Sequence, residues 1–127
     1  HPHPRLWGAF PRVLAHYSRD LKLMPLAEAV RKMTSLSATN FGLTDRGVIR
    51  IGAYADLTLF DLKILEDTAS YETPIAAARG IELVIVNGKI AYHQGTVSDQ
   101  RAGRMLRRTE RILPSTPTIH PNQEQTP

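Results

Sequence analysis

The sequence predicts an α+β chain with helices in its first third and antiparallel strands after them. Three observations support this prediction. Apolar residues recur at helical spacing up to about residue 42, and alternate with a period of two after Gly47. The third is the pair Asn87-Gly88 between two apolar runs, which is typical of a two-residue hairpin turn.

The first helix is predicted to begin near Pro11, because proline suits the first turn of a helix, and residues 1–9 are predicted to be loop. Its apolar stripe comprises Phe10, Val13, Leu14, Tyr17 and Leu21. A second helix is predicted from Pro25 to Met33, with Glu28 in the first turn, where the helix dipole favours an acid.

A short helical turn through residues 38–41 is predicted next. Ser37 is expected to cap it, and Gly42 to close it in the left-handed conformation.

Strands are predicted over residues 55–60 and 81–86, with a hairpin turn at Asn87-Gly88. The expected register pairs Val86 with Lys89, Ile85 with Ile90, Leu83 with Tyr92 and Glu82 with His93. Residues 62–80 are expected to be irregular, with one helical turn around residues 75–78. A short Arg-rich helix is expected beyond Gly103, and disorder from residue 114 to 127.

Composition excludes several classes of protein. The 127 residues contain no apolar run long enough for a membrane span and no signal-peptide pattern at their start, so a cytoplasmic location is the default expectation. Cysteine is absent, which excludes disulfides but does not indicate the redox compartment. The net charge of +4 comes from five arginines between residues 101 and 111, while the rest is nearly neutral. We therefore expect a solvated basic tail, with no nucleic-acid or membrane partner.

Residues 47–61, GVIRIGAYADLTLFD, resemble the pattern G-x-I-x-x-G-x-x-A-D-L-x-x-x-D that follows the barrel in the amidohydrolase superfamily. Residues 26–43 resemble the last barrel helix and the element after it, and residues 81–92 the closing hairpin. The resemblance implies the end of a (β/α)8 barrel over residues 1–43 and a small β-sandwich over 44–100. Residues 101–127 form the tail, and the full barrel is not present.

Residues 3–14, HPRLWGAFPRVL, resemble one branch of this superfamily, the N-acyl-D-amino-acid deacylases (D-aminoacylases). Residues 17–19, 28–34 and 101–104 resemble the same branch. The resemblance implies a C-terminal part of an enzyme in which a zinc-bound water attacks an N-acyl-D-amino acid, with an aspartate as general base.

In that branch, the zinc ligands and the catalytic aspartate precede the segment that this chain resembles. We therefore expect no catalytic residue and no metal ligand here, no zinc bound by this chain, and no activity of the chain alone. One functional residue is implied by the resemblance: Arg5 occupies the position that faces the α-carboxylate of the substrate. A guanidinium suits this role because it donates two parallel hydrogen bonds to one carboxylate.

Other polar residues are expected to be structural. His1 and His3 flank Pro2 in a predicted loop without a third ligand, so we do not expect a metal there. His16 is expected to be solvated, and His93 to pair with Glu82 across the hairpin.

Asp56 and Asp61 lie five apart on a strand, hence on opposite faces, which does not make an acid–base dyad. Asp56 is interpreted as a turn or strand-entry residue. Two interpretations of Trp7 remain: it lines the substrate pocket, or it packs in the core.

Two alternatives remain open at this point. Another amidohydrolase, a cyclic amidase or deacetylase, shares the motif of residues 47–61, and a helix-turn-helix DNA-binding module is suggested by residues 26–43. Whichever holds, uncovered strand edges lead us to expect a homodimer or a loosely associated state.

Overall fold

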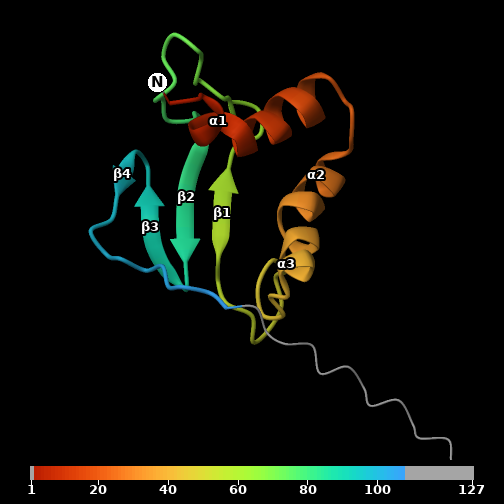
Figure 1. The fold of residues 1–127 in the computed structure, drawn as a ribbon, viewed down its shortest axis with the longest axis vertical. Coiled ribbons are helices and arrows are strands. Elements are labelled where there is room, and N and C mark those ends of the chain that lie inside the picture. The colour runs from red at the N-terminus through yellow and green to blue at the C-terminus, as the bar shows by residue number, and fades with distance from the viewer. Residues whose placement is uncertain (1, 108–127) are drawn as a thin grey trace, which may run out of the picture.

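The computed structural model describes residues 2–107 and has the α+β organisation that the sequence predicts. Helices come first and a four-stranded antiparallel sheet follows, as Figure 1 shows. The elements are α1 (Arg5–Arg12), the π-helix η1 (Val13–Asp20), α2 (Leu26–Met33), α3 (Ser35–Phe41), β1 (Leu57–Phe60), β2 (Ile81–Val86), β3 (Lys89–His93) and β4 (Thr96–Val97).

The first helix begins at Arg5, so the predictions of a loop over residues 1–9 and a helix start near Pro11 were wrong. Pro4 supplies the start instead, because its φ of −56° already suits a helix. Its carbonyl accepts hydrogen bonds from the backbone N–H groups of Trp7 and Gly8, at 3.0 and 3.1 Å. Pro11 lies inside α1, and the chain continues beyond it as the π-helix η1.

Helix α2 confirms the second predicted helix. Helix α3 begins at Ser35, earlier than expected, and Ser37 does not cap it. The Ser37 hydroxyl donates to the carbonyl of Lys32 at 2.7 Å, so its side chain points back to the preceding helix. Gly42 ends α3 at a φ of 72°, the left-handed conformation that was expected.

The sheet has the strand order β1-β2-β3-β4, and its central hairpin turns at Asn87 and Gly88, whose φ angles are 51° and 79°. The turn and the first two predicted pairs, Val86 with Lys89 and Ile85 with Ile90, are confirmed. The next two were wrong by one residue, since Val84 pairs with Tyr92 and Leu83 with His93. A bulge causes the shift: Ala91 is an extra residue in β3.

The segment of residues 62–80 joins β1 to β2 and has no helical turn around residues 75–78, so that prediction was wrong. A β-bridge holds it instead: the backbones of Glu66 and Arg79 exchange two hydrogen bonds, at 3.2 and 3.1 Å. Residues 103–107 are irregular, and the rest of the expected Arg-rich helix, like the expected disorder of 114–127, lies outside the described residues.

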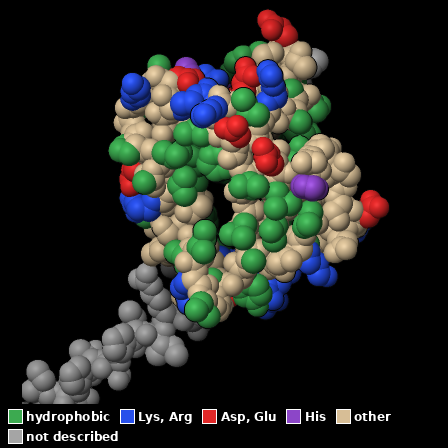
Figure 2. Space-filling model, turned by 180° about the vertical axis from the view of Figure 1, so that it is seen from behind, with side chains coloured by type: hydrophobic (Ala, Val, Ile, Leu, Met, Phe, Trp, Pro, Cys, Tyr) green, Lys and Arg blue, Asp and Glu red, His purple; other side chains and the backbone are tan. Residues whose placement is uncertain are grey.

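The core lies between the helices and one face of the sheet. Its buried side chains are Leu14, Ala15, Ala29 and Leu65, and Phe60 and Ile81 of the sheet pack against them. The register puts five aliphatic side chains on the opposite face: Leu57, Leu59, Leu83, Ile85 and Ile90. Figure 2 shows hydrophobic side chains gathered on this outer sheet face, and Leu59 is 56% exposed there.

Candidate functional site

A cavity of about 700 Å³ lies between the helical segment α1–η1 and the segment of residues 67–72. Figure 1 shows the connection between β1 and β2 running beside α1. Residues of these two segments line the cavity. Its lining residues are His3, Pro4, Arg5, Ala9, Arg12, Val13, Tyr17, Asp67, Ala69, Ser70, Tyr71 and Glu72. Two guanidinium groups and two phenols among them make this wall suited to an anion that carries an apolar group.

Arg5 is the first residue of α1 and lies on the wall of this cavity. Its side chain is exposed, and within residues 2–107 it has neither an ion pair nor a hydrogen bond. Its backbone N–H donates to Nδ1 of His3 at 3.0 Å, which fixes the start of the helix. The start of the helix is therefore fixed by this backbone bond, while the guanidinium has its donors available to a ligand within the described part of the chain.

The opposite wall is attached to the N-terminal segment by an aromatic contact. Tyr71 and His3 lie edge to face with ring centroids 5.3 Å apart, and the Tyr71 hydroxyl is 3.3 Å from Nε2 of His3. His3 thus contacts both walls, as a structural residue.

Gly8 lets the two walls approach each other. It is buried, and a Cβ at this position would lie 1.7 Å from Oδ1 of Asp67. That carboxylate accepts the backbone N–H of Ala69 at 3.0 Å and lies 3.6 Å from the guanidinium of Arg12. A hydrogen bond with Tyr17, and to a smaller extent the charge of Asp67, raise the pKa of Arg12 above its ordinary value, so this guanidinium stays charged. The close approach gives a physical reason for glycine in the segment HPRLWGAFPR.

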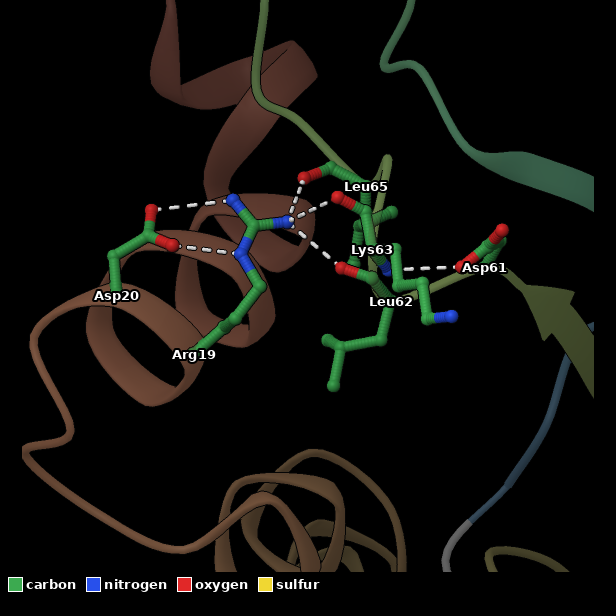
Figure 3. Close-up of polar contacts among 6 residues, drawn as sticks. All are labelled: Arg19, Asp20, Asp61, Leu62, Lys63 and Leu65. Atoms are coloured by element: carbon green, nitrogen blue, oxygen red, sulfur yellow. Dashed lines mark hydrogen bonds and ion pairs between the residues drawn. The ribbon is translucent and has the colours of Figure 1, made fainter.

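Arg19 attaches the β1–β2 connection to η1, as Figure 3 shows. Its Nη1 donates to the carbonyl oxygens of Leu62 and Leu65 at 2.7 and 2.8 Å. Asp20 orients the guanidinium, with Oδ1 2.6 Å from Nε, and this hydrogen bond lowers the pKa of Asp20. The sequence contained no signal for these carbonyl contacts, since main-chain acceptors leave no side-chain pattern.

Asp61 and Asp56 are separate, as their spacing indicated. Asp61 accepts the backbone N–H of Lys63 at 2.8 Å and so begins the connection to β2. Asp56 lies just before β1, as interpreted from the sequence, where it accepts the backbone N–H of Asn87 at 2.7 Å and pairs with Arg46. Burial raises the pKa of Asp56, but the bonds from Asn87 and Arg46 outweigh it and the pKa is lowered.

Unlike His3, the residues Trp7, His16 and His93 are not among those that line the cavity. His93 lies opposite Leu83, and in the described part of the chain it makes no bond to Glu82, so the predicted pair was wrong. His16 is half-buried, with its ring 5.3 Å from that of Tyr17. Trp7 is 49% exposed and is absent from the cavity wall. His1 lies outside the described residues.

The donor set of the described residues does not fit a zinc centre. Between residues 2 and 107, no group of three or more histidine, aspartate, glutamate or cysteine side chains could hold a metal ion. Protein zinc sites use at least three such ligands. The same range contains no helix with the length and apolar character needed to cross a membrane.

Comparison with known proteins identifies relatives of this chain. It is 53% identical over 108 residues to a D-aminoacylase of Alcaligenes xylosoxydans xylosoxydans. The matched region covers 85% of this chain and 22% of that relative. A crystal structure of D-aminoacylase matches 84% of this chain and 23% of its own, with 53% identity and a TM-score of 0.82.

An N-acyl-D-glutamate deacylase of Bordetella bronchiseptica, solved with zinc and a phosphonate inhibitor, is also similar. It is 46% identical with a TM-score of 0.78, over 84% of this chain and 22% of that one. The chain therefore spans less than a quarter of the length of the relatives it matches. The model of the amidohydrolase family matches residues 1–92, including the helices on which the DNA-binding alternative rested. The chain belongs to the amidohydrolase family.

Proposed function

We propose that this chain forms the C-terminal part of a zinc-dependent deacylase that converts N-acyl-D-amino acids to a D-amino acid and a carboxylate. The observation that carries this proposal is the 53% identity to a D-aminoacylase over most of the chain. Similarity of this degree to D-aminoacylases also favours the deacylase over a cyclic amidase or a deacetylase of the same family.

Within this proposal, residues 1–43 are the end of the barrel, residues 44–100 belong to a small β-sandwich, and residues 101–127 are a tail. The helical segment up to residue 42 and the antiparallel sheet after residue 56 are compatible with this division. A cytoplasmic location stays a prediction.

We assign substrate binding to Arg5, which would hold the α-carboxylate of the N-acyl-D-amino acid. Arg5 lines a cavity large enough for such a ligand, and its guanidinium has no partner within residues 2–107. Arg12, the other guanidinium on this wall, already has Asp67 beside it. Arg5 is therefore the better of the two for an incoming carboxylate.

The chain alone should not catalyse the reaction. Activation of water by zinc needs three or more protein ligands, and residues 2–107 offer no such set. In this proposal the ligands and the general base come from the part of the relatives that this chain does not span. The chain contributes a rigid wall and one carboxylate-binding side chain.

A chimera tests this proposal. Residues 3–108 would replace the matching segment of the Alcaligenes D-aminoacylase, and the hydrolysis of N-acetyl-D-methionine would be measured with zinc present. We expect activity, and in the Arg5→Met chimera a large rise in KM. Arg50→Met is the matched control, because Arg50 donates to the Thr44 carbonyl and lies away from the cavity. A folded chimera without activity, or an Arg5→Met chimera with unchanged KM, would contradict the proposal.

We also propose that the chain by itself associates with a second copy. Its sheet ends at two open edges, β1 and β4, and its outer sheet face has no cover within the described residues. Open edges and aliphatic faces favour pairing.

A further inference from the structure

The turn between β2 and β3 is Asn87-Gly88, a pair of residues that carries both groups needed for deamidation. The backbone nitrogen of Gly88 can attack Cγ of Asn87, because glycine has no side chain to shield its nitrogen. The new N–C bond closes a succinimide ring while the Cγ–Nδ2 bond breaks, and Nδ2 leaves as ammonia. Water then opens the ring to aspartate or isoaspartate. The reaction consumes only water, so it needs no other reactant.

Hydrogen bonds restrain both reacting groups, the side-chain amide of Asn87 and the backbone N–H of Gly88. The Asn87 Oδ1 accepts from Nη2 of Arg46 at 2.5 Å, and its Nδ2 donates to the carbonyl of Ala102 at 2.7 Å. The N–H of Gly88, which must lose its proton to become a nucleophile, donates to the carbonyl of Ala55 at 2.9 Å. The amide therefore cannot rotate toward Gly88 without breaking both of its bonds.

Arg46 is a rigid partner for Asn87. Only 7% of it is exposed, it pairs with Asp56, and its guanidinium lies 4.2 Å from the ring centroid of Tyr54. Burial and three partners leave this side chain little freedom, so it restrains the amide of Asn87.

The second partner is held less firmly. Ala102 lies in the segment of residues 101–104, which has neither helix nor strand. Arg104 attaches this segment to the rest, since its guanidinium also lies 4.2 Å from the ring centroid of Tyr54. Exposed segments without backbone pairing open more readily than strands. Opening of residues 101–104 would free Nδ2 of Asn87.

We propose that Asn87 is a latent deamidation site, guarded by Arg46 and by the segment of residues 101–104, and that release of this segment turns the reaction on. Either product adds a negative charge beside Asp56. Isoaspartate also lengthens the backbone by one atom, so the two-residue turn is lost and the pairing of β2 with β3 weakens.

The test follows the mass of the peptide that contains residue 87 while the purified 127-residue chain is kept at mildly alkaline pH. Peptide chromatography separates asparagine, aspartate and isoaspartate. We expect the folded chain to react at least about tenfold more slowly than the same chain in urea, because reaction requires opening. We expect Arg46→Gln to raise the deamidation rate of Asn87 in the folded chain by about tenfold, because one hydrogen bond from a charged group is lost.

Two further variants make the result decisive. Arg50→Gln is the matched control, since Arg50 lies with Arg46 in the connection between α3 and β1 but donates to the carbonyl of Thr44. Its rate of deamidation should not change. Arg104→Gln releases residues 101–104 without changing a partner of Asn87, so its Asn87 should deamidate several-fold faster than in the wild-type chain. This variant keeps the test valid if circular dichroism shows that Arg46→Gln is unfolded. Equal rates in buffer and urea, or a folded Arg104→Gln chain no faster than Arg50→Gln, would overturn the proposal.

Discussion

Gly80 is a position where a single added methyl group should strongly destabilise the fold. It closes the β1–β2 connection at a φ of +80°, which costs a residue with a side chain about 1–2 kcal/mol. A Cβ there would also lie 2.7 Å from Cα and 2.8 Å from the backbone nitrogen of Leu65, a fully buried residue. Because backbone atoms must move, we add about 1–3 kcal/mol for overpacking, and expect Gly80→Ala to cost about 2–5 kcal/mol.

Gly52 provides the matched control. Its φ is +84°, but a Cβ there would have no atom of the described residues within 4 Å, so Gly52→Ala should cost only the backbone term of about 1–2 kcal/mol. Urea unfolding followed by circular dichroism measures both. With a slope of about 1.5 kcal/mol per M, the midpoint should fall by roughly 2 M for Gly80→Ala and 1 M for Gly52→Ala. Equal midpoints for the two variants would refute the close approach of Gly80 to Leu65.

Three further predictions concern charge and exposure. The pKa of Asp56 is lower in the folded chain, so its stabilisation is present above the unfolded pKa of about 3.9 and is lost as the pH falls through the folded value. Asp56→Asn should therefore cost about 2 kcal/mol near neutral pH, and urea midpoints should show this difference shrink as the pH falls below the unfolded pKa. Arg19→Met should lower the melting temperature far more than Arg31→Met, because within residues 2–107 Arg31 bonds only to a surface glutamate, while Arg19 also holds main-chain carbonyls. Similar melting temperatures would argue against that anchor. Leu59→Lys, on the outer sheet face, should abolish concentration-dependent association in sedimentation, and the control Ile75→Lys, in the β1–β2 connection, should leave it unchanged. A wild-type chain that stays monomeric at every concentration would rule out self-association.

The elements that the sequence predicted well are those with a local cause. The hairpin turn required two residues at positive φ, and Asn-Gly is the pair that provides them at least cost. Helix α2 has an acid in its first turn and basic residues in its last. Gly42 ends α3 as a left-handed residue. Each of these depends on a few neighbouring residues.

The errors arose where distant residues decide the backbone. Pro11 suggested a helix start, but Pro4 provides one earlier, and the helix continues through Pro11 into η1. The bulge at Ala91 shifts the register of β2 against β3 by one residue, which no local pattern revealed. The β-bridge of Glu66 with Arg79 replaces the helical turn expected around residues 75–78.

The candidate site was predictable only in part. The family resemblance indicated Arg5, which the structure places on the cavity wall, but its role stays a prediction. The second wall, with Asp67 and Tyr71, comes from a connection about sixty residues further along the chain. Arg46 was missed because a lone arginine near a strand gives no sign of burial, although the aspartate of the A-D-L motif is its partner.

We propose that this chain supplies a wall and a carboxylate-binding arginine, and that the catalytic metal site lies in the part of the relatives that the chain does not span. The most direct measurement is the rate of N-acetyl-D-methionine hydrolysis by the purified 127-residue chain, with added zinc and with a chelator. We predict no turnover above the buffer rate in either condition, since residues 2–107 contain no set of zinc ligands. Zinc-dependent turnover that copurifies with the chain and disappears with the chelator would contradict the account.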